Sequence, residues 1–175
     1  FKSISSLLFS LFIISVSYSQ YNGATPWDNC FGKNAACKYI GCSDIKIKSS
    51  SSPVLVIVKK NENVIKHAYV SSNNSYTFEL PNGTYQVFFY YGKKWSSTKK
   101  MNSDECNYVY GGWIDNEYVS KDNPITLKDQ VMTYTLTQVT YGNFTPKSSS
   151  LSEALWFIYE IYFSYINLMT TKQLE

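Results

Sequence analysis

Four cysteines and a single histidine carry the most specific chemistry in this chain of 175 residues. An even number of cysteines predicts two disulfides in an exported chain, because the destination is oxidising. Three pairings are possible. We favour a local bond between Cys30 and Cys37 and a long-range bond between Cys42 and Cys106. The longer loop would constrain the unfolded chain more, by roughly 4 kcal/mol.

Two other uses of these side chains have less support. The spacings between Cys30, Cys37 and Cys42 do not form the paired knuckles typical of zinc sites. A cysteine nucleophile would need a base, and His67 is the only histidine. His67 lies in the alternating segment 64–70, which predicts a surface or rim position on a strand. One histidine also excludes a multi-histidine metal site. Asp104 and Glu105 could chelate Ca²⁺ with Asp115 or Asp122, but acidic residues in loops are usually only solvated, so we expect no metal and no cofactor.

Five aromatic residues gather around the polar segment 92–112 and are the candidate ligand-binding residues. They are Tyr90, Tyr91, Trp95, Trp113 and Tyr118. Aromatic platforms bind sugars, peptides and protein partners by stacking and apolar burial. The alternative is that these rings form the core or the edge of the domain.

The sequence contains no G-x-S-x-G, H-E-x-x-H, Walker or G-x-G-x-x-G motif. We therefore predict that the protein is not an enzyme but a secreted binding module for an unknown protein or carbohydrate. A structural or accessory protein of the cell envelope, acting through assembly contacts, is the alternative. A small hydrolase is a second alternative, because the separation of two catalytic carboxylates cannot be read from sequence.

The charged residues disfavour nucleic acid as a partner. The chain has 16 basic and 13 acidic residues, a net charge of +3, and every basic residue is lysine. Bidentate recognition of phosphates and base edges relies on arginine. The lysines are also scattered along the sequence rather than clustered.

Residues 1–19 are typical of a signal peptide. Lys2 supplies a positive charge, residues 7–16 are apolar, and Ser17 and Ser19 are small residues before a cut at Gln20. The apolar stretch is short for a transmembrane helix, which needs about 20 residues. We expect a secreted, periplasmic or cell-surface protein. A buried strand or an N-terminal anchor is the alternative.

Alternating apolar residues, with an aromatic share of 17%, predict an all-β domain. We expect a disulfide-held loop over 20–43 and, over 44–146, an antiparallel β-sandwich of about seven to eight strands, Ig-like or transthyretin-like. Parallel pairing is not expected, because no helix-length pattern separates the strands. The expected strands are 44–48, 54–60, 64–70, 76–80, 84–91, 125–127 and 131–141, and the segments 113–114 and 117–120 could be further short strands. Aromatics on both faces of 84–91 predict a central or covered strand, and 92–112 is expected to be a loop.

The last segment, 147–175, differs in composition from the rest. Ser150 and Glu153 can form a capping box, and 154–169 is almost entirely apolar or aromatic. We expect a linker followed by a helix that packs on the domain or makes peripheral contact with a membrane. A membrane anchor and a reading-frame artefact are the alternatives, since the composition changes abruptly.

Two resemblances point the same way. The segment Tyr76-Thr77-Phe78-Glu79-Leu80-Pro81-Asn82-Gly83-Thr84-Tyr85-Gln86-Val87 resembles the strand-turn-strand core of transthyretin-like and carboxypeptidase-regulatory-like sandwiches. It implies a fold more than a function. A wider resemblance, over about 23–144, is to uncharacterised exported proteins of the Bacteroidota; it implies export and no assigned activity. The motifs that carry it are Trp27-Asp28-x-Cys30-Phe31, Gly41-Cys42-Ser43-x-Ile45-Lys46-Ile47-Lys48, His67-Ala68-Tyr69 and Phe88-Phe89-Tyr90-Tyr91-Gly92.

Overall fold

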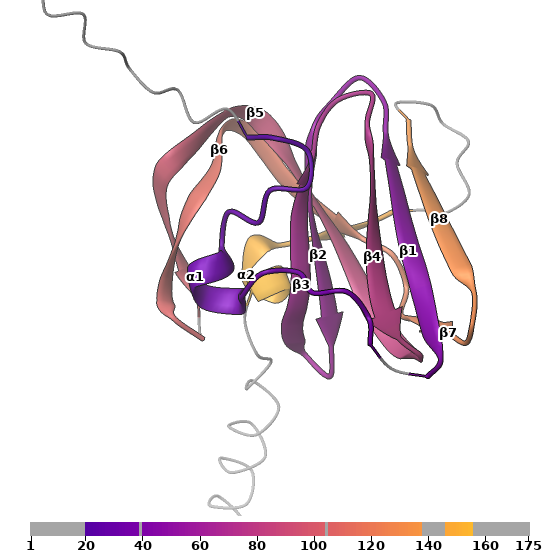
Figure 1. The fold of residues 1–175 in the computed structure, drawn as a ribbon. Coiled ribbons are helices and arrows are strands. Elements are labelled where there is room, and N and C mark those ends of the chain that lie inside the picture. Colours follow the sequence, from indigo (N-terminus) through magenta and orange to yellow (C-terminus); the bar gives the residue numbers. More distant parts are fainter. Residues whose placement is uncertain (1–19, 39, 104, 138–145, 156–175) are drawn as a thin grey trace, which may run out of the picture.

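A computed structural model describes residues 20–38, 40–103, 105–137 and 146–155 of the chain (Figure 1). The expected signal peptide, the end of the expected strand 131–141 and most of the expected helix over 154–169 lie outside these residues. Two sheets form most of the described structure, and two short helices lie beside them.

The smaller sheet has three strands in the order β4-β1-β8. Its strands are β1 (Cys42–Ser49), β4 (Ser75–Pro81) and β8 (Val131–Leu136). The larger sheet has the order β3-β2-β5-β6-β9, and β7 pairs with β5. Its strands are β2 (Val54–Lys60), β3 (Asn63–Val70), β5 (Gly83–Ser103), β6 (Asn107–Lys121), β7 (Ile125–Leu127) and β9 (Lys147–Ser149).

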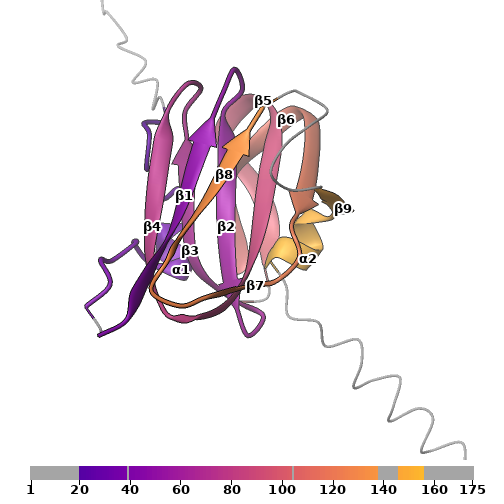
Figure 2. The same ribbon diagram turned by 90° about the vertical axis from the view of Figure 1, so that its right-hand side faces the viewer.

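The expected sandwich of two packed sheets is confirmed, with one exception in the pairing. Strands β1 and β8 run parallel, with Ile45 opposite Met132 (Figure 2). The expectation of purely antiparallel pairing was therefore wrong. Parallel neighbours need a crossover connection, and here the chain reaches β8 from the other sheet, through β6 and β7, rather than through a helix.

Alternating apolar residues fill the space between the sheets. Ile45, Ile47 and Phe78 of the smaller sheet belong to one buried cluster with Val56 and Phe89 of the larger sheet. Side chains on a strand alternate between its two faces. The other residues of these strands therefore face outward, and on the larger sheet they need a second cover.

Strand β5 is central and covered on both faces, as the sequence predicted. Tyr85, Val87 and Phe89 point into the core between the sheets. Phe88 and Tyr90 point to the opposite face of the larger sheet, where a second buried cluster includes Trp27 of the N-terminal segment and Leu155 of the C-terminal helix α2 (Leu151–Leu155).

The expected loop over 92–112 was wrong. Strand β5 continues to Ser103, and β6 returns from Asn107, so the two strands form a long hairpin that curls over the N-terminal segment (Figure 1). Its buried side chains, such as Met101 and Val109, pack in the second cluster with Trp27. Trp27, the partner of these side chains, lies far away from the hairpin in sequence.

The N-terminal segment fills the hollow beneath this hairpin. It contains a short helix, α1 (Asp28–Phe31). The fully buried Trp27 precedes α1, and its indole Nε1 donates a 2.9 Å hydrogen bond to the Gly111 carbonyl. Gly111 has φ +111°, and an added Cβ would meet Trp95 at 3.0 Å. A residue without a side chain is therefore required where the hairpin closes on Trp27.

His67 is buried, so the expected surface or rim position was wrong. Its exposed fraction is 0%, and its Nε2 accepts a 3.0 Å hydrogen bond from the backbone N–H of Trp27. Burial lowers the pKa of His67 to about 4, although the Thr25 backbone and the charge of Asp28 oppose this shift. The histidine is therefore neutral in the folded protein and holds the N-terminal segment in place.

The N-terminal segment also covers the free edge of β3. The backbone N–H of Gly23 donates to the Tyr69 carbonyl at 2.7 Å, and the Tyr69 N–H donates to the Ala24 carbonyl at 2.8 Å. Further along, the Asn34 side chain donates to the His67 carbonyl at 2.7 Å and accepts from the His67 N–H at 3.3 Å. These bonds satisfy main-chain groups that a bare edge strand would leave to water.

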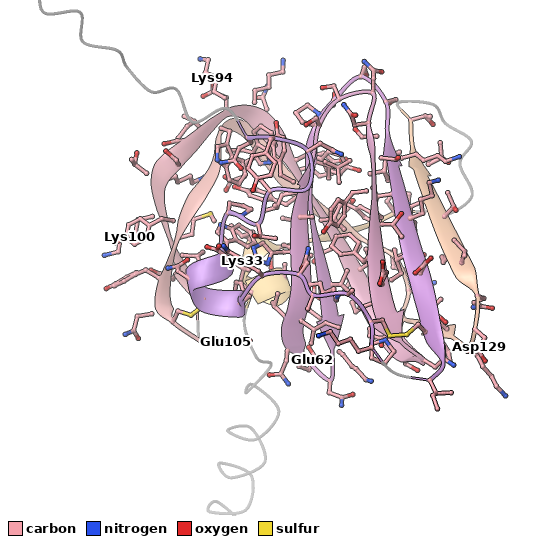
Figure 3. The ribbon with its side chains drawn as sticks, in the orientation of Figure 1. Lys33, Glu62, Lys94, Lys100, Glu105 and Asp129 are labelled. Carbon is pink, nitrogen blue, oxygen red and sulfur yellow. A yellow bond between two sulfur atoms is a disulfide. The ribbon has the colours of Figure 1, made fainter. Side chains whose placement is uncertain are left out.

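Two disulfides form, but the favoured pairing was wrong. Cys30 bonds Cys106, and Cys37 bonds Cys42. Figure 3 shows one bond at the tip of the curled hairpin and the other near Asp129. The hairpin brings Cys106 back onto α1. A loop over 92–112, as expected from sequence, would not place Cys106 next to α1.

Helix α2 begins as the capping box predicts. The Ser150 hydroxyl accepts a 3.1 Å hydrogen bond from the Glu153 N–H. The Glu153 carboxylate binds Lys121 and accepts from the Ser149 hydroxyl at 2.7 Å, and buried Lys59 donates to the Glu153 carbonyl at 2.9 Å. These contacts fix the start of the helix on the larger sheet. Within the described residues, no helix has the length and apolar character that a membrane span needs.

Candidate functional site

The five aromatic residues proposed from sequence do not form one platform. Tyr90 and Trp113 are buried, with exposed fractions of 0% and 2%, whereas Tyr118 is 56% exposed. Tyr91 and Trp95 are half-buried. The structure places Tyr91, Trp113 and Tyr118 on the wall of one groove, and Tyr90 and Trp95 away from it.

Tyr90 and Trp113 hold the base of the hairpin together. The Trp113 N–H donates to the Tyr90 hydroxyl at 3.0 Å, and the Trp113 indole donates to the Tyr90 carbonyl at 3.1 Å. The Tyr90 hydroxyl donates to Glu117 at 2.7 Å. Burial raises the pKa of Tyr90, and Glu117 raises it further. Trp95 packs edge-on against Trp113, with 5.1 Å between ring centroids. These contacts give Tyr90 and Trp95 structural roles.

The groove lies where the curled hairpin leaves the sandwich. It has a volume of about 510 Å³, within the range of about 300–1,000 Å³ that is typical of small-ligand sites. Three parts of the chain line it: the β1–β2 loop, the facing segments of β5 and β6, and the end of β8. The lining residues are Ser50, Ser52, Pro53, Tyr91, Gly92, Lys93, Lys94, Trp113, Asn116, Tyr118, Leu136 and Thr137.

Stacked tyrosines form the aromatic wall of the groove. The rings of Tyr91 and Tyr118 are 4.9 Å apart at an interplanar angle of 11°, and the two residues are cross-strand partners. Burial raises the pKa of Tyr91, so its phenol stays protonated. Beside them, Trp113 lies so close to Gly92 that an added Cβ would be 2.3 Å from the Trp113 Cβ. Gly92 therefore lets the indole pack at the base of the wall.

The polar side chains of the groove are short or cationic. Ser52, Asn116 and Thr137 are exposed and offer hydroxyl and amide groups. Lys94 is paired with Asp115 at 2.7 Å, whereas no described carboxylate lies within ion-pair distance of Lys93. Lys93 therefore brings an unneutralised positive charge to the aromatic wall.

Sequence reasoning missed more than half of this lining. The β1–β2 loop contributes Ser50, Ser52 and Pro53, and the end of β8 contributes Leu136 and Thr137. These residues lie far from 90–118 in sequence and belong to a serine-rich loop and a strand end. No local pattern indicates that they meet the tyrosines, because the parallel pairing of β1 with β8 brings them together.

None of the described residues that line the groove is a histidine, cysteine, aspartate or glutamate. All four cysteines are in disulfides, so no thiol is available as a nucleophile or a zinc ligand. His67 is buried beneath the N-terminal segment and is not among the lining residues. Across the described parts of the chain, no three His, Cys, Asp or Glu side chains are placed to hold a metal ion.

The fold and the groove define a disulfide-bonded protein of two packed β-sheets with one open, aromatic-walled site. A scan of protein-family models, a search of curated proteins and a search of solved structures found no match to the chain. The chemistry of the groove is therefore the feature that indicates a function.

Proposed function

We propose that the protein is an exported, non-enzymatic binding module that holds a saccharide in the groove. The observation that carries this proposal is the Tyr118 ring, which is 56% exposed although it is stacked on Tyr91. Tyr91 supports Tyr118 on one side, so the opposite side of the Tyr118 ring can receive a ligand without any rearrangement.

A sugar ring matches this arrangement in two ways. Its C–H face packs on the electron-rich face of an aromatic ring, and its hydroxyls need hydrogen-bond partners when water is displaced. Tyr118 supplies the ring, and Ser52, Asn116 and Thr137 supply short polar groups elsewhere in the lining of the same groove. Binding would cost little conformational entropy in the protein, since Tyr91 and Trp113 already hold the aromatic wall in place before a ligand arrives.

Export is supported by the disulfides and by the leader-like sequence of residues 1–19. Structural disulfides persist in oxidising compartments outside the cytoplasm, and this chain forms two of them. Strands β4 and β5 flank Asn82 in the strand-turn-strand order of the transthyretin-like and carboxypeptidase-regulatory-like sandwiches that this segment resembles. They do not form a hairpin, because β4 lies in the smaller sheet and β5 in the larger one. We propose an Ig-like or transthyretin-like module of an exported Bacteroidota protein on these grounds.

The proposal predicts that Tyr118→Ala weakens saccharide binding about tenfold, the equivalent of about 1.4 kcal/mol of lost stacking. Binding is measured on an array of neutral and acidic oligosaccharides and then by titration of Trp fluorescence, since Trp113 lines the groove. Tyr110→Ala is the matched control. Tyr110 lies on the same strand and is 50% exposed, but it is not among the lining residues.

Retention of binding by Tyr110→Ala and its loss in Tyr118→Ala would support the proposal. The proposal is wrong if no oligosaccharide on the array binds, or if the two variants lose affinity equally. Binding of peptides but not of saccharides, dependent on Tyr118, would show that the groove serves a protein partner instead.

An assembly role in the cell envelope is the second candidate. The outer side of β6 exposes three large side chains away from the groove: Tyr108 at 43%, Tyr110 at 50% and Ile114 at 53%. Exposed apolar side chains of this kind are common at protein interfaces. Self-association of the full chain that is abolished by Tyr110→Ala, in analytical ultracentrifugation, would favour this function.

A further inference from the structure

We infer that the groove selects an acidic saccharide, one bearing a carboxylate or a sulfate, through the ammonium group of Lys93. This inference rests on the proposed function and names its ligand class. It depends on the charge of the groove and on the backbone that presents the charge.

The charge of the groove is of one sign. Its lining includes Lys93 and Lys94 and no aspartate or glutamate. Asp115 lies outside the lining and bonds Lys94 at 2.7 Å. Although Asp115 is the cross-strand partner of Lys93, its carboxylate is thereby occupied, and Lys93 keeps a net positive charge. An anionic group of a ligand beside Lys93 would therefore gain a charge-assisted hydrogen bond to the ammonium group. A neutral sugar hydroxyl in the same place would gain only a weaker hydrogen bond.

A second hollow in the molecule has the opposite character. It has a volume of about 300 Å³ and is lined by Asp44, Glu79 and Asp129. The acidic Glu105 lies at the other end of the curled hairpin from Lys94 (Figure 3). The positive groove is therefore separated from these carboxylates, and an anionic ligand would be directed to it.

The backbone is irregular where it presents the lysines. Consecutive residues of a regular strand point to opposite faces, so Lys93 and Lys94 should not both reach one groove. The β5–β6 register shifts between Tyr91 and Lys93, and Lys94 has φ +56°. On the facing strand, Asn116 has φ +49°. Such conformations cost of order 1 kcal/mol or more in non-glycine residues and concentrate at functional sites.

The irregular backbone therefore lets both lysines line the groove that the tyrosines also line. Lys94 positions Asp115, and Lys93 is left to pair with a ligand. An acidic sugar stacked on Tyr118 would place its carboxylate or sulfate beside Lys93, so that ring and charge are recognised together. Neutral sugars would gain only the stacking and the hydrogen bonds.

The test compares three oligosaccharides of equal length in titrations of the full chain: an oligogalacturonate, a sulfated chondroitin and a neutral cello-oligosaccharide. We expect at least one acidic probe to bind about tenfold more tightly than the neutral one, with affinity falling as salt rises. Lys93→Gln should weaken acidic binding about fivefold and leave neutral binding unchanged. Lys100→Gln, on the same strand but outside the groove, is the matched control.

The outcomes separate the inference from the function beneath it. Preference for the uronate alone identifies a carboxylate ligand, and preference for the sulfated probe alone identifies a sulfate. Equal or tighter binding of the neutral probe, or equal effects of Lys93→Gln and Lys100→Gln, would overturn the acidic class. If Tyr118→Ala still weakens binding of the neutral probe in that case, the saccharide proposal stands. If Tyr118→Ala has no effect on the binding of any probe, both the saccharide proposal and the acidic ligand class are wrong.

Discussion

Replacing Cys30 and Cys106 together by alanine is expected to lower the free energy of unfolding by about 4.5 kcal/mol. The bond joins residues 76 apart in sequence, so it removes much of the freedom of the unfolded chain. It also ties α1 to the tip of the β5–β6 hairpin, beside the cluster that contains Trp27. Reversible urea denaturation under non-reducing conditions measures the loss.

The second disulfide provides the control. Cys37 and Cys42 are 5 residues apart, and the same chain-entropy relation gives about 2 kcal/mol for so small a loop. The variant lacking this bond should therefore be clearly more stable than the variant lacking Cys30–Cys106. Equal losses, or a larger loss without Cys37–Cys42, would show that the long bond does not constrain the hairpin as described.

Acidification from pH 7 to pH 4 should destabilise the fold by about 3 kcal/mol through His67 alone. The pKa of this histidine falls from 6.5 to about 4 in the folded protein, chiefly because it is buried. Between these values the unfolded chain binds a proton that the folded protein does not. The stabilisation is therefore complete above about pH 6.5 and is lost as the pH falls towards 4.

The variant His67→Gln isolates this contribution. Glutamine offers an oxygen to the Trp27 N–H but does not titrate. The free energy of unfolding of the variant should therefore change less between pH 6.5 and pH 4 than that of the wild type. Glu153 titrates elsewhere: burial raises its pKa, but hydrogen bonds from Lys121 and Ser149 lower it below its ordinary value of 4.5. Its contribution is therefore present above about pH 4.5 and is lost below it. Parallel pH profiles of wild type and His67→Gln would show that His67 is not buried neutral.

Local patterns predicted the elements whose apolar residues repeat with a clear period. Val54–Lys60 forms β2 as expected, and the two faces of β5 bury the residues that alternation assigned to them. The start of α2 at the Ser150 cap was also predicted. In each case the signal lies within a few neighbouring residues, and the surrounding fold reinforces it.

The failures share one cause, which is contact between distant segments. The polar half of the hairpin becomes strand because Met101 and Val109 pack in a cluster with Trp27, more than 70 residues away in the printed sequence. The position of His67 and the partner of Cys30 depend on that same contact. Neither could be deduced from the periodicity of a single segment.

Part of the candidate site could have been predicted from the alternation of side chains between the two faces of a strand. Tyr90 and Tyr91 are consecutive on β5, and consecutive strand residues face opposite sides, so they could not share a platform. The structure puts Tyr90 in the core and Tyr91 in the groove. The choice of Tyr118 as a partner of Tyr91 depends on the register of β5 with β6, which the hairpin irregularities obscure in sequence.

The main chain at Gly23 and Ala24 occupies the rim of β3 where another molecule could otherwise add a strand. The Cys30–Cys106 bond keeps this covering segment from leaving. If reduction of this bond releases the segment, we expect the uncovered edge of β3 to become a place where a second copy of the chain can pair.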